Sequence, residues 1–97
     1  MNGQPQTQQV QIKADDAALK GVYANMMQVA HTKEEFVMDF MNLLPPQGLL
    51  VSRVITSPGH LKRIVAALKD NLDKYEKQFG KIAEAAAPNS DIGFGPR

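Results

Sequence analysis

The stretch PGHLKRIVAALKDNLDKYEKQFG, residues 58–80, reads as one complete helix with both of its ends marked. Ser57 supplies an N-cap side chain, Pro58 suits the first helical position, and Gly80 suits the left-handed position just past the end. At about 100° per residue the apolar side chains fall in one narrow stripe. This helix stripe consists of Leu61, Ile64, Val65, Leu68, Leu72, Tyr75 and Phe79. A stripe that narrow packs against one surface, which the rest of the chain must supply.

The size and composition indicate a single small globular domain. The chain has 97 residues, of which 43% are hydrophobic. We expect the domain over residues 9–82, between disordered tails at residues 1–8 and 83–97. A domain of this size buries only about 60–65% of the surface that its unfolded chain exposes, so its stability is marginal without help from partners.

Charge and residue types disfavour several function classes. The net charge of +1 gives no strong field toward nucleic acid or an anionic membrane surface. The absence of cysteine leaves no disulfide or thiolate chemistry and fits a reducing cytoplasm. The first residues lack the basic and apolar regions of a signal peptide, and no apolar run approaches about 18 residues. We expect a cytoplasmic protein with no membrane contact.

Upstream of the helix, three apolar patterns predict strands. Val10 and Ile12 alternate with polar residues, and a turn at residues 15–16 follows them. Residues 49–56, LLVSRVIT, are rich in β-branched side chains. In residues 36–41, FVMDFM, a strand would place Phe36, Met38 and Phe40 on one face and Val37, Asp39 and Met41 on the other.

The segment 17–44 allows two interpretations. Residues 32–35, TKEE, have the pattern of a capping box, so helices at about 17–30 and 33–44 are one interpretation. Gly21 and Asn25 weaken the first of these helices, and the polar cluster HTKEE equally suits a connector between two strands.

Several phrases, taken together, resemble a known family. They are Val22-Tyr23-Ala24-Asn25, His31-Thr32, Glu35-Phe36-Val37-Met38-Asp39-Phe40, Ser52-Arg53-Val54, Ser57-Pro58 with His60, Asn71, Tyr75 and Phe79-Gly80. In their order and spacing they resemble, over residues 10–80, a family of short bacterial and archaeal proteins known as a domain of unknown function, numbered thirty-four sixty-seven. The resemblance implies strands at residues 22–31 and 35–43, and it implies no activity.

The fold class that follows is α+β, with a four-stranded antiparallel sheet and one C-terminal helix packed on one face. At the level of topology only, this arrangement is similar to the protomer of the SecB-type bacterial export chaperone. Pairing strands 36–44 and 49–56 around the turn at residues 45–48 predicts these neighbours: Asp39 opposite Arg53, Met41 opposite Val51, and Val37 opposite Ile55.

Each face of this predicted sheet has its own role. One face carries the candidate interface or ligand residues Tyr23, Asn25, Met27, Asp39, Met41, Val51 and Arg53. The other face, with Phe36, Met38 and Phe40, seats the helix. Since one helix covers one face, the first face would remain as an exposed apolar patch, and a second copy is the commonest cover. The sequence therefore predicts a homodimer.

The polar residues favour structural roles over catalysis. Asp39 and Arg53 either bind a ligand, beside Tyr23 and Asn25, or form a cross-strand ion pair inside an interface. We favour the ion pair. His31 and His60 lack metal-ligand spacing, so we expect no metal, no cofactor and no catalytic residues.

The charges of the helix exterior also bear on function. They interleave in ordinary pairs, Asp70 with Lys74 and Asp73 with Lys77, which disfavours a nucleic-acid stripe. The sequence predicts a non-enzymatic protein-interaction or chaperone-like module that binds a protein or peptide partner as a homo-oligomer. The alternative is a small nucleic-acid-associated or regulatory protein that uses sheet aromatics such as Tyr23.

Overall fold

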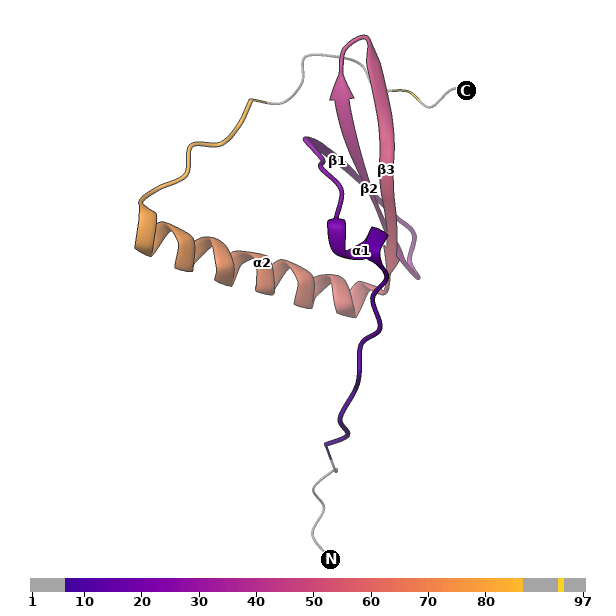
Figure 1. Cartoon of the computed structure of the whole chain (residues 1–97), viewed down its shortest axis with the longest axis vertical. Coiled ribbons are helices and arrows are strands. Elements are labelled where there is room, and N and C mark those ends of the chain that lie inside the picture. Colours follow the sequence, from indigo (N-terminus) through magenta and orange to yellow (C-terminus); the bar gives the residue numbers. More distant parts are fainter. Residues whose placement is uncertain (1–6, 87–92, 94–97) are drawn as a thin grey trace, which may run out of the picture.

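Residues 7–86 and 93 are described by the computed structural model, in which a short helix, a three-stranded sheet and a long helix follow one another (Figure 1). The elements are α1 (Asp16–Lys20), β1 (Met26–His31), β2 (Phe36–Leu44), β3 (Gln47–Thr56) and α2 (Pro58–Phe79). The strands form one antiparallel sheet in the order β1-β2-β3. The α+β class with an antiparallel sheet and a C-terminal helix is confirmed. The predicted tails lie outside the described residues at positions 1–6, 87–92 and 94–97.

The predicted fourth strand, around Val10 and Ile12, is wrong. Residues 7–15 carry no helix or strand, and the side chains of Val10 and Ile12 are 79% and 87% exposed. Alternation alone does not make a strand, because a strand also needs a neighbour to take up its backbone hydrogen bonds. The sheet therefore has three strands in the described part of the chain.

The turn predicted at residues 15–16 is instead the beginning of α1. The Asp15 carboxylate accepts a hydrogen bond from the backbone N–H of Ala18 at 2.8 Å, which is an N-cap. Gly21, with φ of 74°, ends the helix after five residues. The helical interpretation of residues 17–44 is wrong beyond this short element.

The strand predicted over residues 22–31 begins only at Met26, and Asn25 is the reason. Its side-chain Oδ1 accepts from the backbone N–H of Leu43 at 2.8 Å, and its Nδ2 donates to the Leu43 carbonyl at 2.9 Å. The amide side chain thus takes both backbone hydrogen bonds that a strand residue would otherwise make. Residues 22–24 are consequently released from the sheet.

Two tight turns join the strands. Between β1 and β2, the Thr32 hydroxyl accepts from the backbone N–H groups of Glu34 and Glu35 at 3.1 and 3.3 Å. The backbone N–H of Thr32 also donates to the Glu35 carbonyl at 2.9 Å. The TKEE pattern therefore closes a connector between strands rather than capping a helix. A turn joins β2 to β3 where the sequence predicts one, but it consists of Pro45 and Pro46 alone, so β3 begins at Gln47, two residues before the predicted strand.

The predicted register between β2 and β3 is confirmed in one half and wrong in the other. Asp39 pairs with Arg53 and Val37 pairs with Ile55. After Phe40 a β-bulge shifts the register, so that Met41 pairs with Leu50 and Val51 is the extra residue.

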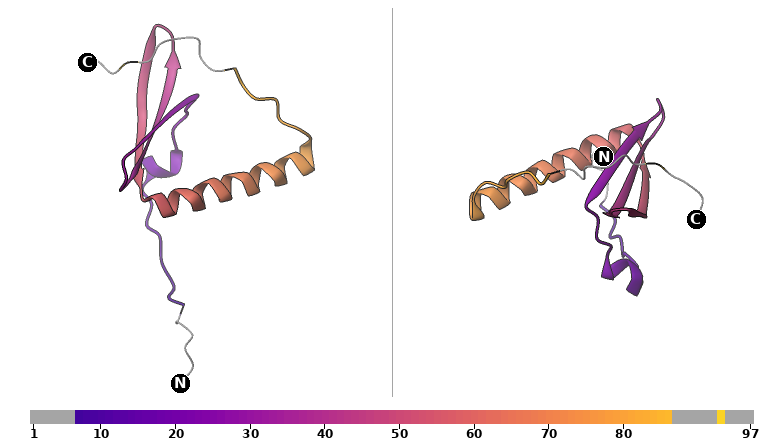
Figure 2. Two further views of the ribbon diagram at one scale, coloured as in Figure 1. Left: turned by 180° about the vertical axis from the view of Figure 1, so that it is seen from behind. Right: turned by 90° about the horizontal axis from the view of Figure 1, so that it is seen from above.

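The long helix has the predicted bounds and caps but does not pack on its own sheet. The Ser57 hydroxyl accepts from the backbone N–H of His60, Pro58 occupies the first turn, and Gly80 follows the last. From the end of β3 the helix runs away from the sheet, as two further views show (Figure 2). None of its residues is buried. The expected packing of α2 on one sheet face of the same chain is therefore wrong.

Candidate functional site

The strand pairing divides the sheet into two faces, because residues directly opposite one another point to the same side. We define the ion-pair face as Met26, Gln28, Ala30, Val37, Asp39, Met41, Leu43, Leu50, Arg53 and Ile55. We define the apolar face as Met27, Val29, His31, Phe36, Met38, Phe40, Asn42, Leu44, Leu49, Ser52, Val54 and Thr56. The apolar face carries no Asp, Glu, Lys or Arg, whereas the ion-pair face has a polar row across its centre.

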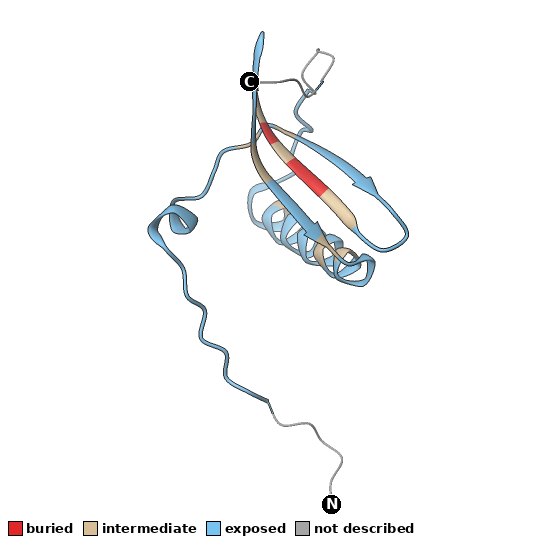
Figure 3. Ribbon diagram, turned by 90° about the vertical axis from the view of Figure 1, so that its right-hand side faces the viewer, coloured by how far each residue is buried: buried red, intermediate tan, exposed pale blue. Residues whose placement is uncertain are grey.

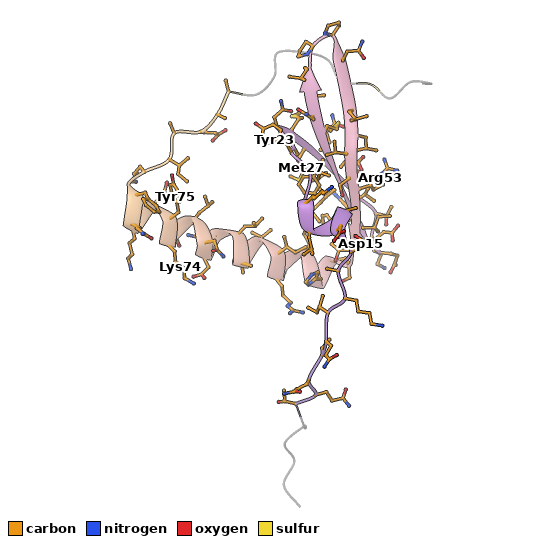
Figure 4. The ribbon with its side chains drawn as sticks, viewed as in Figure 1. Asp15, Tyr23, Met27, Arg53, Lys74 and Tyr75 are labelled. Carbon is orange, nitrogen blue, oxygen red and sulfur yellow. The ribbon has the colours of Figure 1, made fainter. Side chains whose placement is uncertain are left out.

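The predicted site residues do not share one face. Asp39, Met41 and Arg53 lie on the ion-pair face, but Met27 pairs with Phe40 and lies on the opposite one. Figure 4 labels Met27 and Arg53. The neighbour of Asp39 on β1 is Gln28, because the connector between β1 and β2 has four residues. A shift of one residue in register moves every side chain of a strand to the other face.

The three other predicted site residues lie outside both faces. Val51 is the extra residue of the bulge in β3. Tyr23 precedes β1 and is exposed (Figure 4). Asn25 has both polar atoms of its side chain bonded to Leu43, so its amide holds the edge of the sheet rather than facing a ligand.

The ion pair between Asp39 and Arg53 is bidentate. Arg53 Nε donates to Asp39 Oδ1 at 2.6 Å, and a terminal guanidinium nitrogen donates to Asp39 Oδ2 at 2.9 Å. The hydrogen bonds from Arg53 lower the pKa of Asp39, against the opposing effect of burial. The same contact raises the pKa of Arg53. Each carboxylate oxygen accepts one of these hydrogen bonds, so the pair links β2 to β3 at the centre of their register.

The burial of apolar residues is confined to the central strand. Among the described residues, Met38 and Met41 are the buried apolar side chains, with 7% and 2% exposed, and Asp39 beside them is the buried charged one (Figure 3). On the apolar face five large side chains are exposed: Met27, Val29, Leu44, Leu49 and Val54. On the ion-pair face Leu50 and Ile55 are exposed. The larger uncovered apolar surface is therefore the apolar face.

The helix stripe is a second uncovered apolar surface. Five of its members are exposed: Val65, Leu68, Leu72, Tyr75 and Phe79. The rings of Tyr75 and Phe79 lie with their centroids 5.0 Å apart, so they form one aromatic end of the stripe. Ile82, just past the helix, is exposed as well.

Charged side chains pair along the exterior of α2. The predicted pair of Asp70 with Lys74 is confirmed at 2.9 Å, while Asp73 pairs with Lys69 at 3.4 Å instead of with Lys77. Pairs of this kind stabilise a solvent-exposed helix by a few tenths of a kcal/mol each. The helix thus has one charged side, with more basic than acidic residues, and one apolar side.

The histidine of β1 contacts an aromatic ring. The ring centroids of His31 and Phe36, which are cross-strand neighbours, lie 5.1 Å apart. Over the described ranges 7–86 and 93, no three His, Asp or Glu side chains gather closely enough to hold a metal ion. No helix in the same ranges has the length and apolar character to cross a membrane.

Sequence reasoning missed Gln28 as the neighbour of Asp39, and it placed Val51 instead of Leu50 opposite Met41. The four-residue length of the TKEE connector was a signal that could have identified Gln28. The register beyond Phe40 could not have been found in this way, because no residue of β3 marks the bulge.

The fold and its surfaces can now be compared with known proteins. The family model described as "Protein of unknown function (DUF3467)" matches residues 1–84. Neither the comparison with curated proteins nor that with solved structures found a match. The topological likeness to the SecB-type protomer has no support from these comparisons.

Proposed function

The chain belongs to the family described as a protein of unknown function, DUF3467, and on that premise we propose that it is a non-enzymatic, chaperone-like interaction module. It acts as a homo-oligomer and binds an extended apolar segment of a protein partner through a sheet face. The observation that carries this proposal is the exposure of apolar side chains on both the sheet and α2, against two buried apolar residues in the described chain.

The area of the exposed apolar surface favours a protein that binds a partner over one that acts as a monomer without partners. Soluble monomers rarely expose contiguous apolar patches beyond a few hundred Å². A sheet of three strands about 4.8 Å apart, with a longest strand of about 34 Å, offers roughly 450 Å² on each face. Each face is thus about as large as the largest patch on a typical monomer, roughly 300–600 Å², which is often functional, and the apolar face exposes more large apolar side chains than the ion-pair face.

The ion-pair face is the surface proposed for the protein partner. Arg53 has 52% of its side chain exposed while it neutralises Asp39, which has 11% exposed. The guanidinium therefore retains donor capacity for a partner's carbonyl or carboxylate groups. Leu50 and Ile55 add exposed apolar area on the same face. Arginine surrounded by aliphatic side chains is typical of the centre of protein interfaces.

A fluorescence anisotropy titration with a labelled, extended apolar peptide tests the proposal. We expect saturable binding that Ile55→Glu removes, because Ile55 is exposed on the ion-pair face. Glu34→Gln, in the exposed connector between β1 and β2, is the control and keeps the binding. No binding by the parent chain, or equal binding by Ile55→Glu, contradicts the proposal.

A further inference from the structure

We propose that the helix stripe of one copy docks on the apolar face of a second copy, and that the helix stripe of the second copy docks in the same way on the first. We call this reciprocal docking helix exchange. This inference rests on the self-association in the proposed function and names the two surfaces that produce it. The occupant of the apolar face is α2 of another chain. Each chain contributes one helix and one sheet face to a closed, twofold dimer.

The first step is that the two surfaces do not meet within one chain. A single residue, Ser57, joins β3 to α2. Its hydroxyl accepts from the backbone N–H of His60 at 3.2 Å, and its carbonyl accepts from the backbone N–H of Leu61 at 3.0 Å. The ring of Pro58 fixes the next φ angle. From this junction α2 runs outward, away from its own sheet (Figures 1 and 2), and none of its residues is buried.

The second step is that the two surfaces match in size. A helix of 22 residues is about 33 Å long and about 10 Å wide. The longest strand, β3, has 10 residues and spans about 34 Å, and three strands are about 14 Å across. One helix therefore covers one face along its whole length.

The third step is that the two surfaces match in chemistry. The centre of the apolar face consists of Met27, Val29, Met38, Phe40 and Val54, with Ser52 as its one polar member. These side chains are uncharged, so an apolar stripe docks on them without burying an unpaired charge. The ion-pair face is a poorer seat, because its central row, Gln28, Asp39 and Arg53, is polar.

The area of two such contacts suffices for a stable dimer. A helix footprint of about 33 by 10 Å removes roughly 330 Å² from each of the two surfaces in contact. Two reciprocal contacts remove roughly 1,300 Å² in all, within the 1,200–2,000 Å² of a standard interface. One contact alone would fall short, which favours reciprocal exchange over one-sided docking.

The competing occupant of the helix stripe is a second α2. Val65, Leu68, Leu72, Tyr75 and Phe79 are spaced alternately 3 and 4 apart, as in a coiled-coil seam. Such a seam would cover the stripe but leave the exposed side chains of the apolar face uncovered. Helix exchange covers both surfaces at once, and we therefore infer exchange.

Cross-linking of single-cysteine variants of the full chain tests the exchange, and the natural sequence helps because it contains no cysteine. Val29→Cys marks the middle of the apolar face, and Leu68→Cys marks the middle of α2. Ile55→Cys marks the ion-pair face as the matched control. Pairs of variants are unfolded together, refolded and treated with a short bismaleimide. Mass spectrometry then identifies the linked peptides.

The mixture of Val29→Cys and Leu68→Cys is expected to give a cross-linked dimer that the mixture of Ile55→Cys and Leu68→Cys lacks. Efficient self-linking of Leu68→Cys alone would indicate paired α2 helices and overturn the inference. A monomer-sized product of the double variant Val29→Cys/Leu68→Cys would place the helix on its own sheet and overturn it as well. If neither link forms while sedimentation still shows a dimer, the exchange is rejected and the proposed self-association stands.

Discussion

Strand β2 and helix α2 differ sharply in how their apolar side chains are covered. β2 is flanked on both sides by strands and contains Met38, Asp39 and Met41, the buried residues of the described chain. α2 has 22 residues against nine in β2, is capped at both ends and carries two ion pairs, yet none of its residues is buried. Local signals thus suffice to form a helix, whereas burial depends on the surfaces that surround it.

This difference has an energetic meaning. Helices in proteins draw most of their stability from packing of an apolar side rather than from the helix propensity of their residues. The helix stripe of α2 is an apolar surface that nothing in the described part of the chain covers. β2 has its neighbours within the chain, whereas for α2 we propose a neighbour in a second copy.

The largest expected effect is at the centre of β2. Met41→Ala removes a side chain that is 2% exposed, and we expect a loss of about 2–5 kcal/mol in the free energy of unfolding. Urea denaturation followed by circular dichroism measures it. A loss below about 0.5 kcal/mol would mean that β2 is no better packed than the surface of the protein.

The next effect separates the apolar side of α2 from its polar side. Leu68→Asp places a charge in the helix stripe, and we expect dimer dissociation to rise by tenfold or more, since burying a leucine contributes about 1.5–3 kcal/mol. Ala66→Asp, on the opposite side of α2, is the matched control and leaves association unchanged. Sedimentation velocity over a dilution series measures both variants. Equal behaviour of the two variants would contradict a role for the stripe.

A smaller effect is expected at the edge of the sheet. Asn25→Ala removes the two side-chain hydrogen bonds to the backbone of Leu43, and we expect a loss of about 1–2 kcal/mol in stability. Tyr23→Ala, two residues earlier and exposed, should change stability by less than about 0.5 kcal/mol. Thermal unfolding of both variants checks the contrast, and a larger effect at Tyr23 would reverse the assignment.

The smallest expected effect is the acid response of β2. Because the hydrogen bonds from Arg53 lower the pKa of Asp39, this group stabilises the fold above the pKa of the unfolded carboxyl, about 3.9. Its contribution is lost as the pH falls through the lowered pKa of the folded protein. In unfolding experiments between pH 5 and pH 2, Asp39→Asn should lose less stability than the parent. Parallel pH profiles would show that the ion pair does not stabilise the fold.

The features that were predictable from the sequence depend on residues that lie close together along the chain. Ser57, Pro58 and Gly80 mark α2. The pairing of Asp39 with Arg53 was predicted from a turn at residues 45–48, and in the structure a two-residue turn together with the bulge at Val51 gives the same pair. Family resemblance then decided between helix and strand for the region of β1 and β2, since local pattern allowed both.

Other features depend on contacts between distant residues and were not predictable in this way. The amide of Asn25 ends β1 through Leu43, which is 18 positions away in sequence. The extra residue Val51 reverses the faces of Leu49 and Leu50, although nothing in the alternation of β3 marks it. The sequence predicts the cap at Ser57, but this cap joins only residues of the first turn and does not fix the angle between α2 and the sheet.

The mass of the purified full chain at micromolar concentration tests the central claim most directly. If the apolar face and the helix stripe are covered by a second copy, sedimentation equilibrium will give twice the protomer mass of 10.7 kDa. A single species at the protomer mass, stable and with no concentration dependence, would contradict it.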